Sequence, residues 1–576
     1  MRQYFARIRL GVCLPATVLL MSGITHGAES VVAADSIFNH GEIYTPKGWA
    51  QAIAVRNGVM VAVGTDAEIA AFRGPKTQEV DLEGAAVLPG LHDMHVHPMS
   101  GGYQALECGF PQGSSLSTVL DTVKKCAATK KKGEWIVGGQ WDVTSLGRAP
   151  DRKLLDEVVP DNPVQLSDIS GHSAWVNTKA LQVAGIELSA ATRNPAGGII
   201  ERDAAGIPSG VLRETAADKI RGAIPAKTPE QNAQALDVAL KKMLSLGITS
   251  LTDAAMEESE MAAYARLADE GLLKQRVKGC MVWRATADNG VAVADPEYIA
   301  RRNLYLRERF EPRCVKMFLD GVPTDSHTAA LLQPYEGAKA GDSRAKGLLQ
   351  IPPAVLNAAV IRFDAEGLTM KFHAAGDGAV REGLDAIAAA RKANGFSGQL
   401  HELAHNSLVE MSDIRRARSL GATFEMSPYI WFPTPLVPDN AKSVGPERMK
   451  RWTPVKDAID AGGLVVAGSD WPVVPDVSPW VAIETLVTRQ VPGGGGEIIG
   501  AQERITLKQA IDLFTVNGAR EMHARDKEGA LQPGLFADFI VLDRNPLKIP
   551  VTQVHQTQVK FAVIGGEVVY RAAAPR

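Results

Sequence analysis

Two histidines separated by one residue, His95 and His97, are the first residues whose types and spacing indicate chemistry. In an extended segment the side chains at i and i+2 point to the same side, so both imidazoles could reach one metal ion. Alone, a His-x-His pair is more often incidental than a ligand pair. The position of this pair after a strand-length apolar run, Ala86–Leu91, is what favours a metal site.

Four more residues of ligand type stand at the ends of later apolar runs. Lys316 and His373 each end a run, while His405 and Asp470 follow two others. Imidazole and carboxylate ligands of this kind suit zinc or a similar divalent ion. Lys316 has two interpretations. It is either a buried ion-pair partner or, after reaction with CO2, a carbamate whose oxygens could bridge two ions.

The elements that would bring these residues together alternate in type along the middle of the chain. Strand-length apolar runs are mostly separated by amphipathic helix patterns such as Pro229–Leu246 and Pro353–Glu366. Eight strand–helix units predict an α/β fold of the closed (β/α)8 TIM-barrel type, with the active site at the carboxyl ends of the strands. The runs are Ala86–Leu91, Ile248–Leu251, Val277–Val282, Cys314–Phe318, Thr369–His373, Gln399–Leu403, Ala422–Met426 and Leu464–Ala467.

Both ends of the sequence show short strand patterns punctuated by glycine instead. We expect residues 35–85 and 530–576 to form one small β-sandwich domain, and residues 86–529 to form the barrel. Residues 98–228 are far too long for one crossover and contain strand patterns of their own. They are predicted to be a large insertion after barrel strand 1, folded over one face of the barrel.

Composition and the N-terminus limit the class of protein. The 576 residues include 62 Lys+Arg and 65 Asp+Glu, a balance that excludes nucleic-acid binding through bulk charge.

Arg2, Arg7 and Arg9 precede the apolar run Leu10–Ile24, as in a secretory signal peptide. We predict a signal over residues 1–28, with cleavage there or as late as residue 34, and a periplasmic or secreted protein. We expect it to bind a small-molecule substrate and not to bind nucleic acid. We expect no stable association with a membrane after the signal is cleaved. A homodimer is the one oligomeric state that we consider.

Export would permit disulfides, because the compartments outside the cytosol are oxidising. Removal of the signal leaves four cysteines, and Cys108 with Cys126 is the pairing that we favour over one with Cys280 or Cys314. No Cys-x-x-Cys spacing occurs, so a thiolate metal site is not expected.

Longer motifs surround the candidate ligands and follow one another in a specific order. They are Pro89–His97, Gly171–Asn177, Pro208–Glu214, Val315–Gly321, His373–Asp377 and Gly468–Pro472. On these motifs the mature chain resembles the metal-dependent amidohydrolase superfamily, and within it the amidohydrolase-3 or YtcJ-like family. The resemblance implies zinc held by His95, His97, Lys316, His373, His405 and Asp470. It also implies an insertion over the active site that brings Trp141 and His172 near the substrate.

The resemblance further implies hydrolysis of a non-peptide amide-like C–N bond by hydroxide, with Asp470 as general base and then general acid. We expect one or two divalent ions, two being favoured, bridged by carboxylated Lys316. His172 is expected to polarise the carbonyl and bind substrate. Trp141 and His327 are further candidates for substrate binding, although Trp141 could equally be core and His327 could face solvent.

Other functions fit parts of the same sequence. A deaminase or lactonase would use the same metals and aspartate, whereas the full ligand set argues against a non-catalytic binding protein. His401-Glu402-Leu403-Ala404-His405 also matches the His-Glu-x-x-His signature of zinc metallopeptidases, which need it on a helix. The family usually has an Arg-x-Arg-Ile-Glu-His type of segment here, and the difference leaves the role of Glu402 open.

Overall fold

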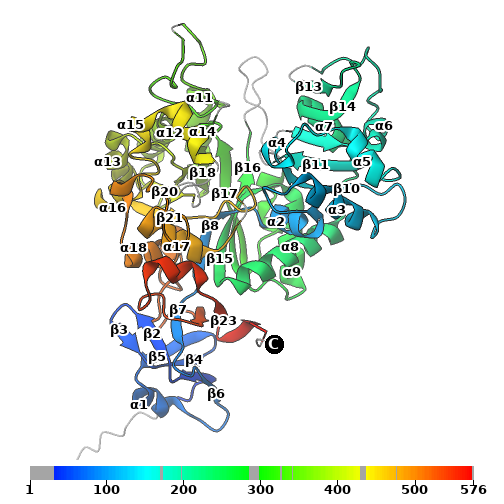
Figure 1. The fold of residues 1–576 in the computed structure, drawn as a ribbon. Helices are drawn as coiled ribbons and strands as arrows, with labels where there is room; N and C mark the ends of the chain where they lie inside the picture. Colours follow the sequence, from blue (N-terminus) through cyan, green and yellow to red (C-terminus); the bar gives the residue numbers. More distant parts are fainter. Residues whose placement is uncertain are drawn as a thin grey trace, which may run out of the picture.

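The computed structural model describes residues 32–168, 173–195, 198–284, 297–324, 327–339, 341–427, 436–474 and 476–573. Figure 1 shows a central barrel, a small β domain below it and an inserted subdomain beside it at the upper right. The predicted signal peptide, residues 1–28, lies outside the described residues. Within the described ranges, no helix combines the length and the hydrophobicity needed to cross a membrane.

Eight parallel strands form the barrel and pair in the order β21-β20-β19-β18-β17-β16-β15-β8, which confirms the predicted (β/α)8 TIM barrel. At the closure, the backbone N–H of Asp470 donates to the carbonyl of His95 at 2.6 Å. A Cβ atom at Gly468 would lie 2.3 Å from the backbone nitrogen of His95, so only glycine allows this approach. The strands are β8 (Leu91–Val96), β15 (Ile248–Met256), β16 (Arg276–Val282), β17 (Phe310–Phe318), β18 (Thr369–Ala374), β19 (Glu402–His405), β20 (Thr423–Met426) and β21 (Leu464–Ala467).

Helices cover the outside of the barrel, and α8 shows why they form where they do. Thr228 and Gln231 make a capping box at its N-terminus, and Pro229 occupies its first turn. Leu236, Leu240 and Met243 recur at helical spacing and are buried on one face. The main covering helices are α8 (Pro229–Ser245), α9 (Glu258–Asp269), α11 (Pro353–Ala365), α12 (Asp377–Asn394), α13 (Met411–Leu420), α16 (Val455–Asp460) and α17 (Pro479–Thr488).

The prediction of the first barrel strand is wrong. The run Ala86–Leu91 splits at Gly90, and Ala86–Pro89 forms β7, which pairs with β22 (Phe539–Leu542) in the small domain. The barrel strand is Leu91–Val96, in which His92, Asp93 and His95 are buried together with the apolar residues. Hydrophobicity misses this strand because its buried side chains are partly polar, and it extends β7 too far because the apolar run is continuous across Gly90.

Both ends of the described chain build the predicted small β-sandwich. One sheet has the order β5-β4-β1-β6 and the other β24-β23-β22-β7-β2-β3. Phe38 and Phe539 pack edge to face across the core, with ring centres 4.9 Å apart. The strands are β1 (Ser36–Asn39), β2 (Glu42–Thr45), β3 (Gly48–Ala50), β4 (Ala52–Arg56), β5 (Val59–Gly64), β6 (Gln78–Asp81), β7, β22, β23 (Val559–Ile564) and β24 (Glu567–Arg571).

The insertion begins with α2 (Pro98–Leu106) and contains a separate sheet of order β13-β14-β12-β11-β10-β9. The favoured disulfide, Cys108–Cys126, is present and joins β9 to α3. A second disulfide, Cys280–Cys314, joins barrel strands β16 and β17. The elements are β9 (Cys108–Gly109), α3 (Leu116–Ala127), β10 (Ile136–Trp141), α5 (Arg152–Val158), β11 (Val164–Asp168), β12 (Ser173–Val176), α6 (Thr178–Val183), β13 (Gly198–Arg202), β14 (Pro208–Glu214) and α7 (Thr215–Ala223).

Candidate active site

A cavity of about 310 Å³ opens at the carboxyl ends of the barrel strands. All six residues expected to hold metal line it: His95, His97, Lys316, His373, His405 and Asp470. They come from strands or from the segments directly after them, as expected for the catalytic face of a barrel. The barrel therefore brings together side chains that are separated by up to several hundred residues in sequence.

Asp470 lies among the histidines at one end of this set. Its Oδ1 is 3.6 Å from Nε2 of His95 and 3.3 Å from Nε2 of His97, and its Oδ2 is 3.8 Å from Nδ1 of His405. Ligand atoms about 2 Å from a tetrahedral zinc ion lie about 3.3 Å from one another, so this spacing suits one ion. Asp470 also has a φ of 55°, an uncommon conformation for a residue other than glycine.

A buried glutamate that was missing from the sequence prediction orients His95. Nδ1 of His95 lies 2.6 Å from Oε2 of Glu425, which is on β20, and this bond leaves Nε2 facing the cavity. Burial raises the pKa of Glu425 to about 8. Donor atoms of His95, His405 and Glu425 also lie within 4.8 Å of one another, which makes a second set able to hold a cation. The sequence signal that could have identified Glu425 is a charged residue inside a predicted barrel strand.

Hydrogen bonds also orient two other histidines. Nδ1 of His373 lies 3.0 Å from Oδ1 of Asp320, a fully buried carboxylate that also accepts backbone N–H groups at Ala375 and Gly376. Nδ1 of His405 lies 2.7 Å from Oγ of Ser427. Burial lowers the pKa values of His95 and His405 well below the ordinary value, which favours the neutral imidazole that binds metal.

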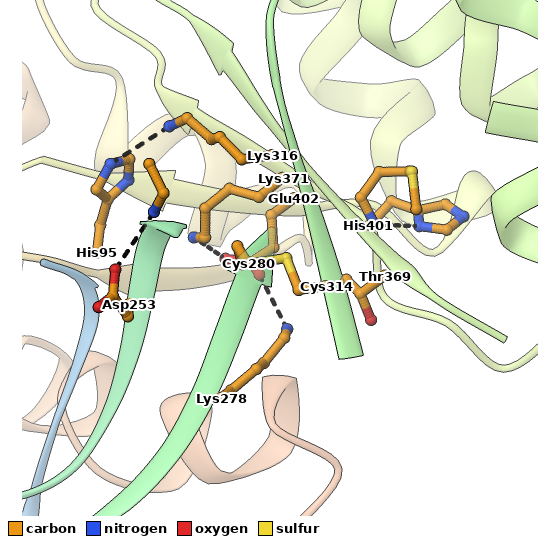
Figure 2. Close-up of a disulfide and its surroundings, with 12 residues drawn as sticks. His95, Asp253, Lys278, Cys280, Cys314, Lys316, Thr369, Lys371, His401 and Glu402 are labelled. Atoms are coloured by element: carbon orange, nitrogen blue, oxygen red, sulfur yellow. Dashed lines mark hydrogen bonds and ion pairs between the residues drawn. A yellow bond between two sulfur atoms is a disulfide. The ribbon is translucent and has the colours of Figure 1, made fainter. Parts of the chain in front are cut away.

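Lys316 is buried in the cavity wall, and its Nζ lies 3.4 Å from Nε2 of His95 (Figure 2). Within the described part of the chain, no ion pair joins Lys316 to a carboxylate. Burial lowers its pKa to about 8, and the neighbouring positive charge of Lys371 acts in the same direction. A larger fraction of Lys316 is therefore the neutral amine, which is the form that reacts with CO2.

Below Lys316 lies a network of buried charges (Figure 2). Nζ of Lys371 is 2.5 Å from Oε2 of Glu402, and Nζ of Lys278 is 3.1 Å from Oε1 of the same residue. Lys278 is also paired with Glu521. Glu402 thus holds two lysines inside the barrel, which answers the question of its role.

The His-Glu-x-x-His segment is a strand, so the metallopeptidase alternative is wrong. Glu402–His405 forms β19, whereas the peptidase signature requires a helix. His401 is bound below the site, with Nε2 2.9 Å from Oδ1 of Asp364 and Nδ1 accepting the backbone N–H of Met370 at 3.1 Å.

Comparison with known proteins identifies the family. The sequence model of the amidohydrolase family matches residues 78–570. The chain belongs to the amidohydrolase family. It is therefore a metal-dependent hydrolase that acts on C–N bonds other than peptide bonds, and the YtcJ-like resemblance is confirmed by the relatives that follow.

Amidohydrolase YtcJ of Bacillus subtilis is 29% identical over 551 residues, which cover 93% of this chain and 99% of that protein. N-substituted formamide deformylase of Arthrobacter pascens is 27% identical over 532 residues, covering 90% of this chain and 95% of that one. The crystal structure of a metal-dependent hydrolase from Pyrococcus horikoshii has the same fold, with a TM-score of 0.72 and 24% identity over 90% of this chain and 99% of that chain.

Trp141 and His327, two further residues predicted for this amidohydrolase, are not among the described residues that line the cavity. Trp141 packs in the core of the insertion, and its indole N–H donates to the carbonyl of Leu166 at 2.9 Å. His327 stacks on the ring of Tyr335, with centres 4.3 Å apart. His172 lies outside the described residues. No role in substrate binding follows from the positions of Trp141 and His327.

Proposed function

We propose that this amidohydrolase is an exported zinc enzyme that hydrolyses a non-peptide amide-like C–N bond, with Asp470 as its proton shuttle. The observation that carries the proposal is the Asp470 carboxylate, which lies within 3.8 Å of nitrogen atoms of His95, His97 and His405. An acid–base group at the centre of a ligand set can move a proton between an attacking water and a leaving group.

The donor set fits a divalent ion, because buried imidazoles and carboxylates dominate it and the bonds to Glu425 and Asp320 turn two Nε2 atoms toward the cavity. His95, His97, His373, His405 and Asp470 would hold the ions, two being favoured, with Lys316 between them as a carbamate. The carbamate forms when the neutral amine of Lys316 bonds to the carbon of CO2 and releases a proton. A divalent ion, when bound, lowers the pKa of water to near 7 and polarises the substrate carbonyl.

In the proposed reaction, a residue of the chain transfers the proton. Asp470 accepts a proton from the attacking water as the C–O bond forms, and donates it to nitrogen as the C–N bond breaks. The products are a carboxylic acid and an amine. Because the A. pascens relative is named an N-substituted formamide deformylase, N-substituted formamides are the first substrate class to test.

Two observations support export to the periplasm or the medium. The sequence pattern of Arg2 to Ile24 is typical of a signal peptide. The described chain also has two disulfides, Cys108–Cys126 and Cys280–Cys314, and such bonds persist in oxidising compartments.

The test combines metal analysis with product analysis on protein expressed with zinc and bicarbonate. We expect about two zinc ions per chain by elemental mass spectrometry, and release of amine and formate from N-butylformamide. Ammonia from an aminated ring, or acid alone from a lactone, would instead indicate the deaminase or the lactonase. No bound metal after loading would overturn the proposal.

Asp470→Asn is expected to lower kcat by about 10²- to 10⁴-fold, because the amide cannot accept and return the proton. Metal content, measured on the same sample, should stay within about twofold of the parent protein. Asp460→Asn provides the control, since Asp460 pairs with Lys456 on the exposed surface of α16. Near-normal turnover in Asp470→Asn would show that the proton takes another route.

A further inference from the structure

A second cavity lies beside the first and shares two wall residues with it, His97 and Val473. Its volume is about 510 Å³, compared with about 310 Å³ for the first. Ligand pockets usually measure about 300–1,000 Å³, so the second cavity is large enough for a substantial chemical group. Since the proposed chemistry takes place in the first cavity, the second has room for a part of the substrate that does not react.

The insertion and the barrel together build the walls of this second cavity. β9, β10 and β11 run parallel to one another, and Gly109, Gln140 and Ser167, at or near their carboxyl ends, line it. Ser100 and Gln104 of α2 also line it. In open α/β sheets, ligands bind in the crevice outside the carboxyl ends of parallel strands. The sheet of the insertion presents that same edge to the cavity.

Gln140 has a backbone conformation that suggests a functional role. Its φ is 86°, and the pairing of β10 with β11 shifts register between Gly139 and Trp141, on either side of it. Bulges of this kind redirect a side chain, and such a φ is strained for a residue other than glycine. Oε1 of Gln140 accepts a hydrogen bond from Nε2 of Gln112 at 3.2 Å, so the amide N–H groups of Gln140 are the end able to donate to a ligand.

Charged side chains of both signs line the cavity. Lys227 forms an ion pair with Glu107, and its Nζ lies 4.7 Å from the centre of the Tyr103 ring. Glu107 follows α2 and Asp168 ends β11, so charged groups lie on both the α2 side and the insertion-sheet side of the cavity.

We infer that this second cavity binds the substituent on the scissile nitrogen, and that it selects a substituent ending in a hydrogen-bond acceptor. Gln140 is the specificity-determining residue, because its amide N–H groups donate to that acceptor. The inference rests on the proposed amide hydrolysis, since the shared wall residue His97 connects this subsite to the site of bond cleavage.

The test uses three formamides that differ only at the end of the chain on nitrogen. The chain has the same length in each and ends in a methyl, a carboxamide or a carboxylate group. In zinc-loaded protein, kcat/KM for the carboxamide should exceed that for the methyl compound by about tenfold, the effect of one hydrogen bond to a neutral acceptor. Gln140→Glu keeps the size and the acceptor for Gln112 but adds a negative charge, and should lower kcat/KM for the carboxamide by about tenfold. Gln182→Glu, on the exposed surface of α6, is the matched control and should change neither value.

Calorimetry separates failure of the subsite from failure of the proposed reaction. The three compounds are titrated into zinc-loaded Asp470→Asn, which should bind but not cleave them. If no compound is hydrolysed by the parent protein and the carboxamide still binds more tightly than the methyl compound, the subsite is supported and the proposed reaction is wrong. If the compounds are hydrolysed but Gln140→Glu leaves their relative rates unchanged, the subsite is overturned and the reaction stands. Neither hydrolysis nor preferential binding would overturn both.

Discussion

Single hydrogen bonds at the site hold one ring nitrogen of three of its four histidines. The carboxylates of Glu425 and Asp320 hold Nδ1 of His95 and His373, and the hydroxyl of Ser427 holds Nδ1 of His405. A metal-ligating histidine commonly donates its other ring N–H in this way, which fixes the tautomer and the ring orientation. The affinity for metal should therefore depend on residues that need not touch the ion.

Glu425→Gln should weaken zinc binding by about 10- to 100-fold, the usual effect of losing a carboxylate behind a histidine ligand. The amide can still accept a hydrogen bond from His95, but it cannot ionise, and the carboxylate is the form that makes a metal-binding imidazole more basic. Competition with a chromophoric chelator measures the zinc affinity. Glu447→Gln is the control, because Glu447 is exposed and pairs with Lys450. Unchanged affinity in Glu425→Gln would remove Glu425 from the metal site.

The sequence allowed the six candidate ligands to be found because each stands at or just after the end of a strand. Glu425 was missed because it lies inside β20, where an apolar run was the stronger signal. Asp320 was missed because its role depends on backbone N–H groups at Ala375 and Gly376, some 55 residues later in the chain. Contacts of this kind are set by the pairing of strands, which no local pattern contains.

At the scale of the strand, β19 has a candidate metal ligand at its carboxyl end and a residue of the buried charge network at its amino end. His405 ends it at the cavity, while Glu402 begins it among Lys371 and Lys278. Burial raises the pKa of Glu402, but the two lysines outweigh it, so that the pKa falls to about 2. A carboxyl whose pKa is lowered in the folded state stabilises that state above its ordinary pKa and loses this effect as the pH falls.

Glu402→Gln should lower the free energy of unfolding by about 3–5 kcal/mol at neutral pH, because it leaves the buried Lys371 without its carboxylate and leaves Lys278 with Glu521 alone. The difference from the parent protein should be constant above about pH 5 and shrink as the pH falls toward 2, where Glu402 itself becomes protonated. Urea unfolding between pH 7 and pH 3 measures both effects. A difference that grew on acidification would contradict this assignment of charge.

The disulfide between β16 and β17 acts at the same scale. Cys280 and Cys314 are directly opposite in the parallel register, and Lys316 follows Cys314 by two residues on the same strand. Figure 2 shows this disulfide together with the charged residues around it. The bond therefore links the strand that carries Lys316 to its neighbour.

Replacing both Cys280 and Cys314 by alanine should destabilise the barrel by about 2–4 kcal/mol, or lower its Tm by about 5 °C or more. The matched control is the pair Cys108→Ala and Cys126→Ala, which removes the disulfide of the insertion instead. Scanning calorimetry of the zinc-loaded proteins should assign the first loss to the barrel transition and the second to the insertion. Equal effects on one transition would mean that the two bodies unfold together.

For the whole molecule, alternation of strand and helix predicted the barrel, and the glycine-punctuated ends predicted the small β domain. The boundary between these bodies was misplaced because β7 and β8 are consecutive and separated only by Gly90, although they belong to different sheets. The long interval between the first two predicted barrel strands, residues 98–228, predicted the insertion. Its second cavity was beyond prediction, since it forms only where α2, the insertion sheet and the segment after β21 meet.

The candidate ligands come from several strands of the barrel or the segments after them, so a bound metal ion should stabilise the barrel as a whole. His95 is on β8, Lys316 on β17 and His373 on β18, while Asp470 follows β21. A ligand that binds only the folded state, at a free concentration about 1,000 times its Kd, adds about 4 kcal/mol to the free energy of unfolding. Removing zinc with a chelator should therefore lower the Tm of the barrel transition, and adding zinc with bicarbonate should restore it. In His95→Ala the chelator should have little further effect, because the ligand set is already broken. A chelator shift of equal size in parent protein and His95→Ala would mean that the stabilising ion binds elsewhere.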